Sequence, residues 1–257
     1  MAILVRADGA RLYHEEHGDP AAPSIVLLEG MGGDIPGWRR NIPHLAAELH
    51  VIAYDFRGNG GSGEPTGPVT MGTFVDDTIA VLDSLGVGRA HVYGQSFGGM
   101  VAQELAIEHP RRVITLVLAA THCGGRHVIE VPLHAIPKGE PWRALYAPGF
   151  VEAHPAHVAE DLRVGSEQPR HALGARRQWE AMQDFDAYDR LPSIQAPTLV
   201  LHGSQDRVVA AGNAQVLASR IRGAELVMIE GAGHLYHSER ATEADEVVLD
   251  FVRRHRR

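Results

Sequence analysis

The chain has 257 residues, of which 44% are hydrophobic, 22% charged and only 6% aromatic. This composition is typical of a globular protein and excludes collagen-like, low-complexity and disordered chains. With 24 Lys and Arg against 32 Asp and Glu, the net charge is -8, which disfavours broad electrostatic binding to nucleic acid or to an anionic membrane.

The first elements predicted along the chain are strands. The segments 3–5 and 12–15 flank Asp8-Gly9, a dipeptide that favours the tight turn of an antiparallel hairpin. Six short, mainly apolar runs follow, as expected of strands that are buried on both faces of a parallel sheet. They cover residues 24–28, 51–54, 91–93, 113–118, 198–201 and 226–229.

Helical patterns separate several of these runs. Mainly apolar residues recur at three- and four-residue spacing from Phe74 to Leu85 and stop at Gly86, and a second helix, 100–109, ends before Pro110. Strand and helix in alternation predict a doubly wound α/β sheet with right-handed crossovers. Ligands bind such sheets at the carboxyl ends of the strands.

The alternation stops between Thr121 and Leu191. This stretch carries several prolines and bulky aromatic residues but no convincing strand. We therefore expect residues 121–190 to form a helical cap, or lid, inserted into a core domain that consists of residues 1–120 and 191–257. The cap is expected to cover the upper edge of the sheet.

The motif Gly94-Gln95-Ser96-Phe97-Gly98-Gly99 lies directly after one predicted strand and directly before a predicted helix. A nucleophile on a tight strand-to-helix turn needs small residues two positions to either side, because the backbone there is strained and closely packed. Isolated matches to this pattern arise by chance, but the strand and helix around it supply the expected context. Ser96 is therefore a candidate nucleophile.

With this motif the chain resembles the α/β-hydrolase family over nearly its whole length except the cap. That family has a mostly parallel, doubly wound sheet and places its catalytic residues in the order Ser, Asp or Glu, His. Asp206 follows the run at 198–201, and His234 follows the run at 226–229. The resemblance therefore implies a triad in which His234 takes the proton of Ser96 and a carboxylate fixes the His234 tautomer.

Two other acids are weighed against Asp206 in the resemblance. Thr121 occupies the position where some relatives carry their acid after an earlier strand, which closes that alternative. Asp55 belongs to a turn of structural importance in the family and stays outside the catalytic set. The other interpretation of Asp206 is that it caps the following helix.

The resemblance also implies an oxyanion hole made by the backbone N–H groups of Phe97 and Met31. The chain departs from the family at Glu29-Gly30, where His-Gly is usual. A carboxylate aimed into the hole would repel the charge that the hole must stabilise. We hypothesise that Glu29 points away and is neutralised by an arginine or by backbone amides; the alternative is tolerated drift at a position behind the site.

The predicted cap supplies candidates for substrate binding. An apolar acyl pocket is predicted from Trp142, Tyr146, Trp179 and Met182, and a substrate carboxylate would be bound by one of Arg126, Arg143, Arg176 and Arg177. The alternative is that the aromatic side chains pack the cap onto the core and that the arginines face water.

The sixteen histidines raise the question of a metal site. His14 and His17 point to opposite faces of a predicted strand, and His154 and His157 lack a nearby cysteine or carboxylate pattern of metal-site spacing. His202, beside a strand end, is a candidate for the pocket border, and His237 is an alternative to His234 as the base. We therefore expect neither a metal nor a cofactor.

A serine nucleophile narrows the chemistry that the resemblance allows. Epoxide hydrolases and haloalkane dehalogenases of this fold need a carboxylate where Ser96 stands. The chain is most similar to the lactonase, carboxylesterase and perhydrolase branch, which implies a serine hydrolase that cleaves a small ester, lactone or thioester through an acyl-enzyme. Two alternatives stay open: a meta-cleavage-type carbon–carbon hydrolase, and a small-ligand receptor or sensor with little turnover.

Cellular location and partners follow from what the sequence lacks. Cys123 cannot form a disulfide within the chain, and the apolar segment 2–5 before Arg6 is too short for a signal-peptide core. No run approaches the length of a membrane span. We expect a cytoplasmic protein with a small-molecule substrate and no nucleic-acid or membrane partner. The oligomeric state stays open, a homodimer included.

Overall fold

A computed structural model describes residues 2–65, 67–169, 171 and 173–255. Within these residues one sheet contains eight strands in the order β1-β2-β4-β3-β5-β6-β7-β8. They are β1 (Ala2–Val5), β2 (Arg11–His17), β3 (Ser24–Leu28), β4 (His50–Tyr54), β5 (Ala90–Gln95), β6 (Val113–Ala119), β7 (Thr198–Gly203) and β8 (Glu225–Ile229). β2 is antiparallel to both its neighbours, and the other pairs are parallel. The predicted mostly parallel α/β sheet is confirmed.

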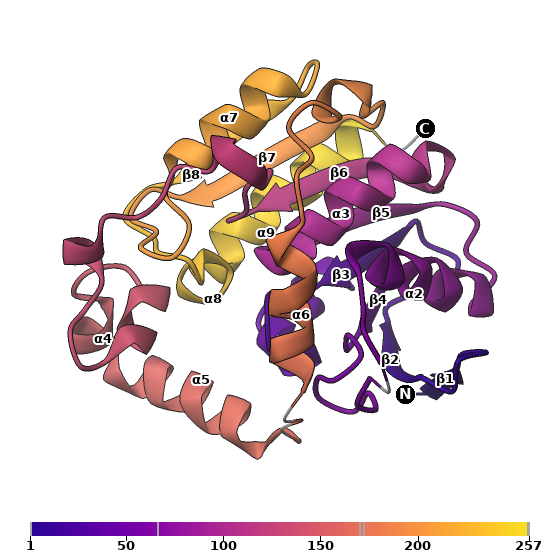
Figure 1. The fold of residues 1–257 in the computed structure, drawn as a ribbon, viewed down its shortest axis with the longest axis horizontal. Coiled ribbons are helices and arrows are strands. Elements are labelled where there is room, and N and C mark those ends of the chain that lie inside the picture. Colours follow the sequence, from indigo (N-terminus) through magenta and orange to yellow (C-terminus); the bar gives the residue numbers. More distant parts are fainter. Residues whose placement is uncertain (1, 66, 170, 172, 256–257) are drawn as a thin grey trace.

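Helices cover both faces of this sheet (Figure 1). In β3, Val26 and Leu28 belong to one apolar cluster, whereas Ile25 and Leu27 belong to another. This alternation places successive side chains on opposite faces and explains why the strand is apolar throughout. The first cluster is closed by α2 (Met71–Ser84), α3 (Phe97–Glu108) and α7 (Gly212–Arg220), and the second by α1 (Ile42–Leu45) and α9 (Ala241–Arg254).

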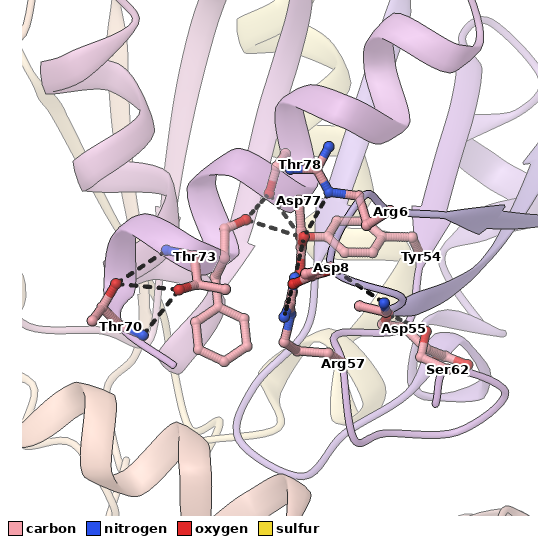
Figure 2. Close-up of polar contacts among 12 residues, drawn as sticks. Arg6, Asp8, Tyr54, Asp55, Arg57, Ser62, Thr70, Thr73, Asp77 and Thr78 are labelled. Carbon is pink, nitrogen blue, oxygen red and sulfur yellow. Dashed lines mark hydrogen bonds and ion pairs between the residues drawn. The ribbon is translucent and has the colours of Figure 1, made fainter. Parts of the chain in front are cut away.

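Polar contacts fix α2 against the sheet (Figure 2). At its start, the Thr70 hydroxyl accepts from the Thr73 N–H at 3.3 Å and the Thr73 hydroxyl accepts from the Thr70 N–H at 3.1 Å, which completes a capping box. Further along, the buried Asp77 accepts two hydrogen bonds from Arg57, at 2.6 and 2.7 Å, and one from Arg6 at 3.2 Å. The hairpin, the loop after β4 and α2 are thereby joined.

The segment between β6 and β7 contains α4 (Phe150–Ala153), α5 (Pro155–Glu167) and α6 (Gly174–Gln183). Figure 1 draws α4 and α5 away from the helices that cover the sheet. The division into a core and a cap at residues 121–190 stays a prediction. In the part of the chain that the structure describes, no helix combines the length and the apolarity needed to cross a membrane.

Candidate active site

Ser96 lies on the sharp turn between β5 and α3. Its backbone has a φ of 52°, a left-handed conformation that a residue with a side chain rarely adopts. Two hydrogen bonds hold this turn: the Ser96 N–H donates to Ala119 O at 2.8 Å, and the Thr121 hydroxyl donates to Ser96 O at 2.7 Å. A Cβ atom at Gly98 would collide with the backbone carbonyl of Leu28, so only glycine lets α3 start this close to β3.

Asp206 and His234 meet beyond the ends of β7 and β8. The Nδ1 atom of His234 is 2.8 Å from Asp206 Oδ2, and Asp206 Oδ1 accepts from the N–H groups of Val208 and Val209 at 2.8 and 2.9 Å. Burial alone would raise the pKa of Asp206, but the charge of His234 and a hydrogen bond from His202 outweigh it and lower the pKa below its usual range. Asp206 is therefore ionised at neutral pH. The Oδ1 contacts lie in the loop before α7, whose N-cap is Ala211 and has no side-chain cap, so the helix-cap interpretation of Asp206 is wrong.

Ser96 and His234 line the same cavity, which has a volume of about 630 Å³. Among the described residues, the Ser96 hydroxyl makes no hydrogen bond to the His234 ring. Such contacts are often long without substrate and shorten when it binds. His237 also lines the cavity, but the contact to Asp206 is made by His234.

The loop after β3 forms one wall of the cavity and includes Met31. Two of its amides are already engaged: the Gly32 N–H donates to Gln178 Oε1 at 2.8 Å, and the Gly33 N–H donates to Gly30 O at 3.1 Å. Phe97, directly after Ser96, is the first residue of α3, where a backbone N–H has no partner within the helix. These positions suit the predicted pair of oxyanion donors.

Glu29 is buried under this loop. Its Oε1 accepts from the Gly30 N–H at 2.8 Å, while Oε2 is buried without a hydrogen-bond partner among the described residues. Gly33 and Gly37 pack so closely on the side chain that a Cβ atom at either would collide with it. Burial raises the pKa of Glu29 to about 7. The arginine partner hypothesised from the sequence is not found within the described residues. The carboxyl contacts a single backbone amide instead, and its raised pKa favours the protonated, neutral form.

Asp55 holds the far end of the same loop. Its Oδ1 accepts from the Ile35 N–H at 2.8 Å, its Oδ2 accepts from the Gly61 N–H at 2.7 Å, and burial raises its pKa to about 6. Nearby, the Asn59 side chain donates to Gly33 O at 2.6 Å. Asp55 comes from the turn after β4 (Figure 2). Although it stood outside the predicted catalytic set, it connects two loops that line the cavity.

The cavity wall differs from the predicted acyl pocket. Tyr146 lines the cavity, whereas Trp142, Trp179 and Met182 do not. Trp142 packs beside Tyr146 in a small cap cluster, Met182 packs on the main core, and Trp179 is 54% exposed. For these three residues the sequence indicates apolarity but not direction, since a side chain of the cap can turn to the core or to water.

The four predicted arginines also lie outside the cavity wall. Arg143 pairs with Glu140 and Glu152, and Arg176 and Arg177 both pair with Glu180. Arg126 donates to His127 at 3.4 Å. These side chains already pair with neighbouring residues, which agrees with the alternative that they face water and do not bind the substrate.

A different arginine reaches the cavity. Arg39, from the 3₁₀ turn after the loop of Met31, pairs there with Asp161 of α5. Asp161 also accepts from Tyr146 Oη at 3.0 Å and from Ser238 Oγ at 2.8 Å. This polar cluster combines four distant segments, so no local motif could have revealed it. Apolar side chains, including Leu145, Leu162, Val164, Val208 and Leu235, supply much of the remaining wall.

Comparison with known proteins places the chain in a family. Residues 25–248 match the alpha/beta hydrolase family. The chain belongs to the α/β-hydrolase family. RutD of Azorhizobium caulinodans, whose name designates a carbamate hydrolase, is 32% identical over 253 residues, covering 94% of this chain and 95% of RutD.

Two further relatives are enol-lactonases. The 3-oxoadipate enol-lactonase 2 of Acinetobacter baylyi is 29% identical over 261 residues, with 96% of this chain and 95% of that protein covered. The crystal structure of the enol-lactonase from Burkholderia xenovorans LB400 superposes with a TM-score of 0.84 at 26% identity and covers 98% of this chain and 99% of that one. The relatives are hydrolases and lactonases by name, which supports the prediction of an esterase- and lactonase-like enzyme.

Proposed function

We propose that this α/β-hydrolase is a serine hydrolase that cleaves a small lactone or ester through a covalent acyl-enzyme. One observation carries the proposal: Ser96, held at a φ of 52°, lines the same cavity as His234, whose Nδ1 lies 2.8 Å from the buried Asp206 carboxylate. The weakly acidic Ser96 hydroxyl needs a base to take its proton, and His234 needs a carboxylate to fix its tautomer and stabilise its imidazolium form.

In the first half of the reaction, the Nε2 atom of His234 takes the proton of Ser96 Oγ as this oxygen attacks the substrate carbonyl carbon. The carbonyl oxygen becomes negative and accepts hydrogen bonds from the N–H groups of Met31 and Phe97. The protonated His234 then gives its proton to the departing oxygen. In a lactone the departing alcohol stays attached to the acyl group, so the ring opens.

In the second half, water attacks the acyl-enzyme. His234 accepts a proton from the water, the oxyanion forms again in the same hole, and collapse of the intermediate returns the proton to Ser96 Oγ and releases the acid. Asp206 stays ionised throughout and stabilises the imidazolium that forms twice in each cycle. The low pKa of Asp206 fits this role.

Glu29 is compatible with this chemistry only when it is neutral. Its pKa of about 7 lets the carboxyl stay protonated in much of the population at and below neutral pH. A neutral carboxyl under the loop of Met31 does not oppose a negative charge on the substrate. We propose that Glu29 supports the loop as a protonated acid where the family usually has histidine.

The preference for lactones and esters is supported by the two enol-lactonases among the relatives and by the size of the cavity. At about 630 Å³, the cavity suits a small molecule rather than a polymer. Arg39 and Asp161 line this cavity together with apolar side chains such as Leu145, Leu162 and Leu235. We propose a substrate with a short apolar acyl part and a polar group at its far end.

The test is a substrate panel of small lactones, nitrophenyl esters, thioesters and vinylogous diketo acids, assayed with the wild-type protein and Ser96→Ala. The proposal predicts multiple turnovers on lactones or esters that the variant loses. Cleavage of the diketo acids alone would contradict it in favour of carbon–carbon hydrolysis. Tight binding of panel members without turnover would contradict it in favour of a receptor.

A further inference from the structure

His202 is a second buried histidine beside Asp206. It is the second-last residue of strand β7, before the loop that carries Asp206, and its side chain has no exposed area. Its Nε2 atom is 3.1 Å from Asp206 Oδ2 and 2.9 Å from the backbone oxygen of Val209. Its Nδ1 is buried without a partner among the described residues.

These contacts assign the ring proton of His202. Both acceptors, a carboxylate oxygen and a backbone carbonyl oxygen, face Nε2. A bare nitrogen lone pair at Nε2 would be repelled by both oxygens, whereas an N–H at that position can be shared between them. Neutral His202 therefore carries its proton on Nε2 and donates it toward Asp206.

The carboxylate of Asp206 is then saturated with donors. Its Oδ1 accepts hydrogen bonds from the N–H groups of Val208 and Val209, and its Oδ2 faces the ring nitrogens His234 Nδ1 and His202 Nε2. A carboxylate offers about four lone-pair sites, so every site is used. Donors on both oxygens fix the rotation of the carboxylate and hence the direction from which His234 is held.

We propose that His202 is a positioning residue of the triad, a second imidazole that shares Asp206 Oδ2 with His234 and keeps this oxygen directed at the catalytic base. The inference rests on the proposed function, since it concerns the efficiency of the same base. Its alternative is a purely structural role in which His202 only ties the end of β7 to Val209.

The pH profile separates these roles. If His202 stops sharing Asp206 Oδ2, the carboxylate holds the His234 imidazolium proton more strongly, and the acid limb of kcat/KM moves to higher pH. Other titratable groups face this pair and must stay unchanged in the experiment. They are Glu29 on the loop after β3, His122 on the loop after β6, and His237 and Glu239 on α8 (Tyr236–Glu239).

The experiment compares three variants. In His202→Gln the amide nitrogen takes the place of Nε2 and keeps the donor. In His202→Asn the amide nitrogen corresponds to Nδ1 and cannot reach Asp206, and His202→Leu has no donor. His91→Gln is the matched control, because His91 is equally buried at the opposite end of β5 from Ser96.

We expect His202→Asn and His202→Leu to lower kcat roughly 10- to 100-fold with little change in KM, the range of loss seen when residues that orient metal ligands are replaced. Both are expected to shift the acid limb upward, and His202→Gln to recover most of both effects. His91→Gln is expected to leave the profile unchanged. The one-dimensional proton NMR spectrum should also show a changed chemical shift for the hydrogen-bonded ring proton of His234 in His202→Asn and His202→Leu.

The inference is overturned if a folded His202→Asn or His202→Leu protein keeps the wild-type kcat and acid limb. It is also overturned if His202→Gln loses as much kcat as His202→Asn, since the donor would then be irrelevant. If both donor-free variants fail to fold, the Gln variant with a wild-type profile still supports the inference, and with a shifted profile overturns it. Failure of the proposed function looks different, because the wild-type protein would then show no Ser96-dependent turnover.

Discussion

Replacing Glu29 with glutamine tests the claim that this carboxyl is protonated under the loop of Met31. The pKa of Glu29 rises from 4.5 to about 7 on folding, and a tenfold change in proton affinity is worth about 1.4 kcal/mol. Because the folded state binds the proton more tightly, its stabilisation is complete below pH 4.5 and is lost as the pH rises through 7. The ionised side chain therefore costs the fold about 3 kcal/mol at pH 8.

Glutamine keeps an oxygen for the Gly30 N–H and cannot ionise. Relative to the wild type, Glu29→Gln should therefore gain about 3 kcal/mol in the free energy of unfolding between pH 4 and pH 8. Urea denaturation at both pH values measures this difference, and the other titrating groups cancel in the comparison. The exposed Glu130→Gln is the control. If the stability difference for Glu29→Gln changes by less than about 0.5 kcal/mol, the protonated acid is refuted.

Three further substitutions test the scaffold around the site. Asp55→Ala leaves the buried Ile35 N–H and the part-buried Gly61 N–H without their acceptor. Thermal or urea unfolding should show a loss of about 2 to 4 kcal/mol, and a loss below 0.5 kcal/mol would contradict the role given to this carboxylate. Gly98→Ala should yield no soluble enzyme because its Cβ would collide with the end of β3. Gly72→Ala is the control and should express normally, because a Cβ there meets only Thr70 Oγ1 at 3.6 Å. Equal yields of the two variants would argue against the close approach of α3 to β3. Asp77→Ala leaves Arg57 buried without its bidentate partner and should cost about 3 to 5 kcal/mol in urea unfolding, so a near-neutral result would contradict the importance of the cluster.

The residues proposed for the triad could be located from the sequence because each lies shortly after the end of a strand. The strand at 91–93 fixes where Ser96 stands, and the strands at 198–201 and 226–229 do the same for Asp206 and His234. Parallel strands end at one edge of the sheet, so residues that are far apart in the chain meet there. The structure brings Asp206 and His234 to within 2.8 Å, as this reasoning requires.

The cavity wall could not be found in the same way. Arg39 and Asp161 are brought together by the packing of α5 over a turn, and no periodic pattern fixes that arrangement. Trp179 shows the converse, since the sequence predicts it in the acyl pocket but its side chain is exposed. Glu29 departs from the family pattern in the sequence, but its isolation and raised pKa depend on the loop that covers it.

The most direct test of the account is a comparison of single-turnover and steady-state kinetics for the wild type and Ser96→Ala on the best lactone or ester of the panel, with the trapped acyl-enzyme located by mass spectrometry. The account predicts an acyl group on the peptide that contains Ser96, and a loss in kcat on the order of 10⁵ to 10⁶ in the variant. A loss below tenfold, or an acyl group on another residue, would contradict it.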